Sequence, residues 1–354
     1  MTRSRNAALV TSVAAMFALA AGCNNNNSTP TDAGNPLDAG TPVDAGTPTD
    51  GGTTDGGTAT NTDGGNPTTA VAATSNPGED VFALALDAAP SHDGATIYFI
   101  AVDGNGGAVF KTSAAAGSTP TLLSDAPPLG APLGIAVSSD GSKLYLADPA
   151  ALTATDKGAI LVESVGGGTP TMLTETIDFA PRAVAVTKIG GADEIVFIGT
   201  STTANADGTF TDGVFEDVGG TVTLVVAGGN PSAVAVATDG TIYILDQAGS
   251  IAKVAPTATT ATALPGASQT LNVSFPSGMD LSLDQTELVV SGFDATGKEA
   301  VNRVNISTGA VTQLTLAPVL VGTEPGGLHR AFNSDTFAFV DSSANTSGTI
   351  YLLK

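Results

Sequence analysis

The sequence has no tryptophan, only one cysteine and two histidines, and 12 basic residues among 354. A single cysteine excludes an internal disulfide framework and any zinc site built from several cysteines. Two histidines leave little material for an imidazole-based metal or acid–base centre. Without tryptophan, a cleft that stacks sugar rings on indole is disfavoured. The shortage of basic residues leaves a net charge of -22, which repels phosphate, so we expect no nucleic-acid partner.

The first 23 residues have the pattern of an export signal. Two arginines precede an apolar run, Ala7–Leu19, that is too short to span a bilayer as a helix. The run leads into Leu19-Ala20-Ala21-Gly22-Cys23, and small residues directly before a cysteine resemble the lipobox of bacterial lipoproteins. That resemblance implies a lipidated Cys23, which anchors the protein to a membrane. The alternative is an ordinary signal peptide with an incidental cysteine, since Ala20 stands where the family usually has leucine.

Residues 24–68 form a low-complexity segment of Asn, Asp, Gly, Thr and Pro without Lys or Arg. This composition cannot bury enough apolar area to offset the entropy of ordering, so we expect a disordered tether of roughly 35–40 Å. Its Asp repeats could instead form a calcium array, although they lack the Glu and loop length of known calcium repeats. Residue 24 is Asn and not the Asp that retains enteric lipoproteins at the inner membrane. This resemblance implies the outer membrane or cell surface of a Gram-negative bacterium.

The remainder, residues 69–354, consists of six copies of one repeat. A proline followed by an apolar strand recurs at Pro132, Pro181, Pro231, Pro276 and Pro325, and a looser copy, Val81–Leu86, begins near Pro77. Each copy continues with a turn, often Asp-Gly, and with further short apolar runs. In the fifth copy the third run is Val301–Ile306. Four antiparallel strands in a unit of about 48 residues describe a β-propeller blade.

The predicted fold is therefore all-β, a six-bladed propeller of four-stranded antiparallel blades. The last copy stops at Lys354, directly after its third strand. The segment Thr68–Thr74 precedes the first copy, where a fourth strand belongs. We expect it to pair with Tyr351–Leu353 and to close the ring, because closure removes exposed sheet edges.

Two second strands end in related motifs, Leu144-Tyr145-Leu146-Ala147-Asp148 and Ile242-Tyr243-Ile244-Leu245-Asp246. They resemble the Tyr-Trp-Thr-Asp repeat of six-bladed propellers and are similar to NHL repeats and to the gluconolactonase/TolB-like superfamily. The likeness covers residues 69–354 and implies architecture rather than function. Five copies carry an aspartate at this place, which we call the repeat aspartate: Asp103, Asp148, Asp246, Asp294 and Asp341. These are candidate binding residues arranged in a ring, or each caps its own turn by accepting backbone N–H groups.

Lactonases of the gluconolactonase type hold a divalent cation at the propeller mouth with a Glu, an Asn and an Asp. The family's Pro-Asn-Gly lacks its Asn here, since Pro132-Leu133-Gly134 and Pro276-Ser277-Gly278 stand in its place. The remaining candidate metal ligands are Glu79, Asp178 and Glu324, in loops that join fourth strands to first strands. We predict no cofactor from the residues themselves, and a divalent cation is the one that the resemblance leaves open.

The other candidates are isolated. Blade three carries an insertion, Thr200–Asp212, which is either a recognition loop, with Asp212 as a candidate binding residue, or a tolerated surface loop. His92 falls in a hairpin turn, where we expect it to be solvated. His329 lies on the first strand of blade six, where a packed wall histidine is favoured over a catalytic one. We recognise no nucleophile elbow and no phosphate-binding loop.

Three functions remain open. A lipid-anchored binding or scaffold module of the cell envelope, with a protein or an envelope polymer as partner, is favoured because no catalytic set is recognised. A metal-dependent lactonase or related hydrolase is the enzymatic alternative, and a purely structural envelope protein is the third. We favour a non-enzyme and a monomer, in contact with a membrane through Cys23.

Overall fold

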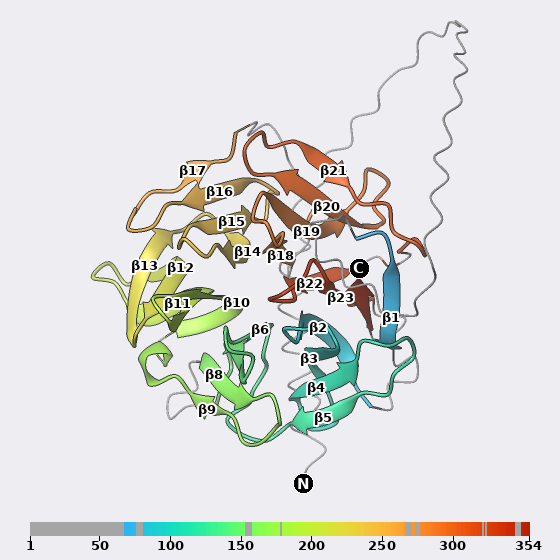
Figure 1. Ribbon diagram of the computed structural model, residues 1–354. Helices are drawn as coiled ribbons and strands as arrows, with labels where there is room; N and C mark the ends of the chain where they lie inside the picture. The colour runs from blue at the N-terminus through green and yellow to red at the C-terminus, as the bar shows by residue number, and fades with distance from the viewer. Residues whose placement is uncertain are drawn as a thin grey trace, which may run out of the picture.

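The computed structural model describes residues 67–75, 81–152, 158–177, 179–265, 271–273, 277–320, 322, 324–343 and 348–354. The predicted export signal with Cys23 and nearly all of the predicted tether lie outside the described residues. The described part forms six four-stranded antiparallel sheets arranged around a central axis, with one short 3-10 helix, η1 (Thr174–Thr176) (Figure 1). No helix in this part is long and apolar enough to cross a membrane.

The first three blades follow one another along the chain. From the axis outwards, blade one has β2 (Ala83–Pro90), β3 (Thr96–Val102), β4 (Gly107–Ser113) and β5 (Thr121–Ser124). Blade two has β6 (Gly134–Val137), β7 (Lys143–Asp148), β8 (Ala159–Ser164) and β9 (Thr171–Met172). Blade three has β10 (Phe179–Ile189), β11 (Ala192–Ala204), β12 (Phe210–Val218) and β13 (Thr221–Ala227).

Blades four to six complete the ring, and the last one takes its outer strand from the beginning of the domain. Blade four has β14 (Pro231–Val236), β15 (Ile242–Asp246), β16 (Ile251–Val254) and β17 (Thr262–Ala263). Blade five has β18 (Met279–Leu281), β19 (Glu287–Phe293), β20 (Glu299–Asn305) and β21 (Val311–Gln313). Blade six has β22 (Pro325–Arg330), β23 (Phe337–Asp341), β24 (Thr349–Leu353) and β1 (Ala70–Ser75).

The closure of the ring is confirmed. β1 pairs antiparallel with β24, with Ala70 opposite Leu353 and Ala72 opposite Tyr351. In Figure 1 the blue strand β1 lies beside the dark red strands of blade six. The fourth strand of the last blade therefore comes from the other end of the folded chain, as the repeat count predicts.

The hydrophobic core is divided among the interfaces between neighbouring blades. Six clusters of buried residues occur, and each combines side chains from two adjacent blades. The cluster between blades one and six contains Phe82, Phe99 and Phe110, whose rings pack at centroid distances of 5.2–5.8 Å. Strands are buried on both faces in this arrangement, which explains why the repeat reads as apolar runs rather than as a strict alternation.

The first strand of blade one departs from the prediction. β2 begins at Ala83 and continues to Pro90, so Val81–Leu86 is only partly correct. Ala89 stands opposite Tyr98, as Ala136 stands opposite Tyr145 in blade two. The repeat thus lies further along the chain here than the sequence suggested. A break in the β2–β3 register between Ala83 and Asp87 shifts the copy, and no proline marks its true start.

The insertion in blade three is a β-hairpin and not a loop. β11 and β12 extend past the ends of the corresponding strands, and Ala204 stands opposite Phe210 close to the hairpin tip. Threonine-rich sequence has high strand propensity, so the insertion continues the ladder. A smaller correction concerns blade five, where β20 begins at Glu299 and not at Val301.

Candidate functional site

The six first strands surround a cavity at the end of the axis where they turn into the second strands. We call it the turn-end cavity, and its volume is about 160 Å³. One equivalent residue from every blade lines it, which in blades two to six is the fifth after the repeat proline: Pro90, Val137, Val186, Val236, Leu281 and Arg330. Five of the six are apolar, so the arginine of blade six is an exception to the repeat.

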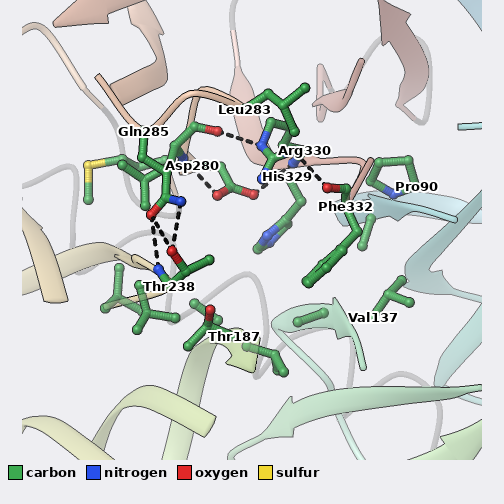
Figure 2. A pocket seen from close by; sticks show the side chains of 18 of the residues that line it. Pro90, Val137, Thr187, Thr238, Asp280, Leu283, Gln285, His329, Arg330 and Phe332 are labelled. Atoms are coloured by element: carbon green, nitrogen blue, oxygen red, sulfur yellow. Dashed lines mark hydrogen bonds between the residues drawn. The ribbon is translucent and has the colours of Figure 1, made fainter. Parts of the chain in front are cut away.

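The neighbouring repeat position shows the same asymmetry. Blades one to four carry alanine there, whereas blades five and six carry Asp280 and His329. In Figure 2 these two residues lie with Arg330 and Gln285 on one side of the turn-end cavity, while Val137 and Thr187 lie away from them. The wall is therefore apolar over most of its circumference and polar along one arc.

The arc is held rigidly by hydrogen bonds to the main chain. Asp280 accepts the N–H of Leu281 and the N–H of Arg330, both at 2.7 Å. The guanidinium of Arg330 donates to the carbonyl oxygens of Leu281 at 2.7 Å and Ala331 at 2.6 Å. Among the described residues it forms no ion pair with a carboxylate. Arg330 therefore brings a positive charge to the cavity of an acidic protein, with its guanidinium bonded to carbonyl oxygens and the carboxylate of Asp280 nearby.

His329 links three blades through Asp87. Its Nε2 lies 3.2 Å from Oδ2 of Asp87, which also accepts the N–H of Ile135 at 2.9 Å. Burial by itself would lower the pKa of His329, but the negative charges of Asp87 and Asp280 outweigh burial and raise this pKa. The contact with Asp87 therefore favours the protonated form of His329 and holds its ring in the wall of the axis.

A second cavity, the inner cavity, lies further along the axis and has a volume of about 20 Å³; Asp87, Arg182 and His329 are among its lining residues. Arg182 forms a bidentate ion pair with Asp212 at 2.7 and 2.9 Å. Burial acts to raise the pKa of Asp212, but hydrogen bonds from Arg182 and Thr200 lower it below its usual value. Asp212 therefore fastens the extended hairpin of blade three to the axis.

The repeat aspartates serve their own turns. Each accepts at least one backbone N–H from a nearby residue, for example Asp103 from Asn105 and Asp246 from Ser250. Asp294 accepts those of Thr296 and Lys298. None of the five repeat aspartates lines the turn-end cavity or the inner cavity. Turn capping accounts for the geometry of most of them, and Asp341 is the exception treated below.

The candidate metal ligands are not brought together in the described part. Glu79 and Asp178 lie outside the described residues, and Glu324 is an exposed residue just before β22. The described residues contain no group of three or more His, Cys, Asp or Glu side chains that could hold a metal ion. His92 also differs from expectation. It is partly buried, its Nε2 lies 2.9 Å from the carbonyl of Ser138, and its ring stacks on Phe332.

Sequence reasoning missed Asp87, Arg182, Asp280 and Arg330. Their signal is present but faint, because each is a charged residue at a repeat position that is small, apolar or neutral in most other blades. Aligning the six copies residue by residue identifies Arg182, Asp280 and Arg330 as exceptions to the repeat. Asp87 could not be found in this way, because the register break in blade one hides its true repeat position.

No family model matches the sequence, and no curated protein matches it. Solved structures that match in fold include a calcium-binding protein, regucalcin, from Agrobacterium tumefaciens, with 12% identity and a TM-score of 0.53 over 81% of this chain and 95% of that one. A gluconolactonase from Xanthomonas campestris matches with 15% identity and a TM-score of 0.54, over 84% and 97% of the two chains. A protein of unknown function from Bacteroides thetaiotaomicron matches with 16% identity and a TM-score of 0.53, over 80% and 75%. At these identities the likeness shows the fold alone, and this chain is a six-bladed β-propeller with gluconolactonase- and regucalcin-like structural neighbours.

Proposed function

We propose that this chain is a binding module of the bacterial cell envelope, anchored by a lipid on Cys23, that receives its partner in the turn-end cavity. The observation that carries the proposal is the difference between the two ends of the axis. The turn-end cavity has about 160 Å³, and the inner cavity has about 20 Å³. Cavities of roughly 150 Å³ accommodate a molecule the size of benzene. The turn-end cavity is therefore a socket for one small group.

The lining of the socket defines the group that fits. The ring of Pro90, three valines and Leu281 favours an apolar body. Arg330 and His329 on the polar arc provide donors and positive charge, so the group also carries a hydrogen-bond acceptor or an anion. A side chain of a protein partner, or the equivalent group of an envelope polymer, satisfies both requirements. The ion-paired side chains of Arg182 and His329 line the inner cavity, which has only about 20 Å³ and therefore offers little room for a chain threaded through the ring.

The test compares two variants with the same substitution in blade three. Val186→Phe fills the turn-end cavity, whereas Val218→Phe adds the same bulk at an exposed position of β12. We expect the full-length wild type and Val218→Phe to retain a saturable partner from envelope extracts, and Val186→Phe to lose it at least tenfold. Retention by Val186→Phe would contradict the socket. No saturable partner in any form would favour a purely structural envelope protein.

A metal-dependent lactonase is the second candidate, and the fold likeness to a gluconolactonase is the observation that favours it. Glu324, in the loop before β22, is the described residue best placed to contribute a ligand at the mouth. The candidate predicts turnover of a panel of lactones in the presence of calcium, zinc or manganese. It also predicts a large loss of kcat/KM in Glu324→Gln. Absence of turnover with all three cations would end this alternative.

A further inference from the structure

Two buried acidic side chains meet between blades five and six, away from the axis. Glu299 is the first residue of β20, and Asp341 is the last residue of β23. Both residues are 4% exposed, and neither lines the turn-end cavity or the inner cavity. Gly322 lies directly over them: a Cβ at this position would overlap Oδ2 of Asp341 and Oε2 of Glu299. The two carboxylates therefore share one small, roofed space.

The carboxylate of Glu299 has no hydrogen-bond donor in the described part of the chain, on either oxygen. The N–H of Glu324 is near enough to favour the charged form, but it does not meet the geometry of a hydrogen bond. Oδ1 of Asp341 accepts the N–H of Ser343 at 2.8 Å. Two buried carboxylates in contact cannot both be ionised without a compensating positive charge, so this space holds either a shared proton or a cation.

The repeat shows that this pair is an addition and not a requirement of the fold. Glu299 lies two residues before Val301 on β20. Counted from the register of the first and second strands, the residues at the same place in the other blades are Gly107, Gly158, Asp212, Gly249 and Gly348. The main chain is alike at two of these places, because the N–H of Gly107 donates to the carbonyl of Gly130 as the N–H of Glu299 donates to that of Gly322. Glu299 thus stands at a buried position that is glycine in four blades, and the aspartate of blade three is paired with Arg182. Folding gives no reason for a glutamate there.

We propose that Glu299 and Asp341 form a binding site for a divalent cation, between blades five and six and beneath Gly322, with calcium as the ion that fits best. Carboxylate oxygens are the preferred ligands of hard cations, and calcium accepts an irregular set completed by main-chain carbonyls and water. Magnesium demands a near-ideal octahedron and is disfavoured. Two carboxylates predict weak binding, about 10⁻⁴–10⁻³ M.

Thermal unfolding of the full-length protein tests the site. We expect calcium at about tenfold over its dissociation constant to raise the midpoint by about 2–4 °C relative to EDTA, and magnesium to do less. Glu299→Gln, which keeps the shape of the protonated acid, should abolish the calcium shift. Asp148→Asn alters the same repeat position in blade two, where no second carboxylate stands, and should lower the midpoint but keep the shift.

Terbium provides a readout that does not depend on stability. The protein has no tryptophan and four tyrosines, and Tyr351 lies near the pair, since Asp341 and Glu299 contribute after burial to raising its pKa. Tyrosine-sensitised terbium luminescence should appear in the wild type, decrease on adding calcium, and be lost in Glu299→Gln and in Tyr351→Phe. Only Glu299→Gln should also lose the calcium shift. No luminescence and no calcium shift in the wild type would overturn the proposal, because the pair would then share a proton instead of a cation.

Discussion

Asp148 and Asp341 occupy the same repeat position in blades two and six, and their surroundings are opposite. Asp148 is fully buried and accepts three N–H groups, from Gly130, Ala131 and Ala150, at 2.7–3.0 Å. Asp341 accepts one N–H from the described residues and faces a second carboxylate, Glu299. A buried carboxylate that accepts several backbone N–H bonds is satisfied by the fold itself. The comparison teaches that one repeat position can be purely structural in one blade and available to a ligand in another.

The largest effect on stability is expected from removing Asp148, whose carboxylate is satisfied by main-chain N–H groups. Asp148→Ala strands three backbone donors and should lower the free energy of unfolding by about 3–5 kcal/mol. Asp341→Ala strands one donor but relieves repulsion with Glu299, so its effect in EDTA should be within about 1 kcal/mol. Urea unfolding of both variants in EDTA measures the difference. Equal losses would show that the two aspartates play the same role.

The next prediction concerns the roof of the carboxylate pair. Gly322→Ala places a Cβ against the oxygens of Asp341 and Glu299 and should cost about 2–3 kcal/mol by overpacking. In a Glu299→Gly background, which restores the arrangement of blade one, at least half of that cost should disappear in a double-mutant cycle. Gly130→Ala is the matched control, because its Cβ would meet the main chain of Ala150 and Glu299→Gly cannot relieve it. If the free-energy costs of Gly322→Ala and Glu299→Gly were additive, the side chain of Glu299 would not contact residue 322.

A third buried carboxyl group, that of Glu163, shows how burial raises a pKa where no second carboxylate is among the causes. Glu163 accepts a hydrogen bond from Ser124 at 2.8 Å, and burial raises its pKa to about 7 despite that bond. Its folded pKa lies above the unfolded value of 4.5, so the stability it contributes is complete below that value and is lost as pH rises to about 7. Between about pH 5 and pH 8 the wild type should lose roughly 2 kcal/mol relative to Glu163→Gln. Denaturant titrations at both pH values measure this, and a constant difference would refute it.

The smallest effect is expected at the partly exposed repeat aspartate of blade five. Asp294 caps its turn by accepting the N–H groups of Thr296 and Lys298, which are both exposed residues. Water replaces such bonds readily, so Asp294→Asn should change the midpoint of thermal unfolding by less than about 1 °C. A differential scan against the wild type is sufficient. A shift as large as that of Asp148→Asn would mean that burial does not separate the members of the repeat.

The blades were predictable because their signal is repeated. Prolines before first strands, Asp-Gly turns and apolar runs recur in nearly every copy, and an error in one copy is corrected by the others. Blade one shows the limit, since its proline is out of register and β2 was placed too early. Blade three shows another, because a threonine-rich insertion reads as a loop until its ladder is seen.

The candidate sites were harder to predict because each depends on residues that occur once. Asp280, His329 and Arg330 matter because neighbouring blades place them on one arc of the axis. Glu299 looks like a solvated residue at the start of a strand, and nothing in the chain near it indicates that it is buried. Its only sequence signal is that the equivalent position is glycine in four of the other blades, and that alignment requires the registers of β18 with β19 and of β19 with β20.

The amino-acid sequence by itself determined the number of blades, their four-strand order and the closure by a strand from before the first copy, because these follow from a local pattern and its period. The tertiary structure alone decided which charged residues meet. Contacts such as Glu299 with Asp341 and His329 with Asp87 join different blades, and only the curvature of the closed ring brings those strands face to face. Burial and the loss of water then give these pairs their chemistry, and neither quantity is a property of the linear chain.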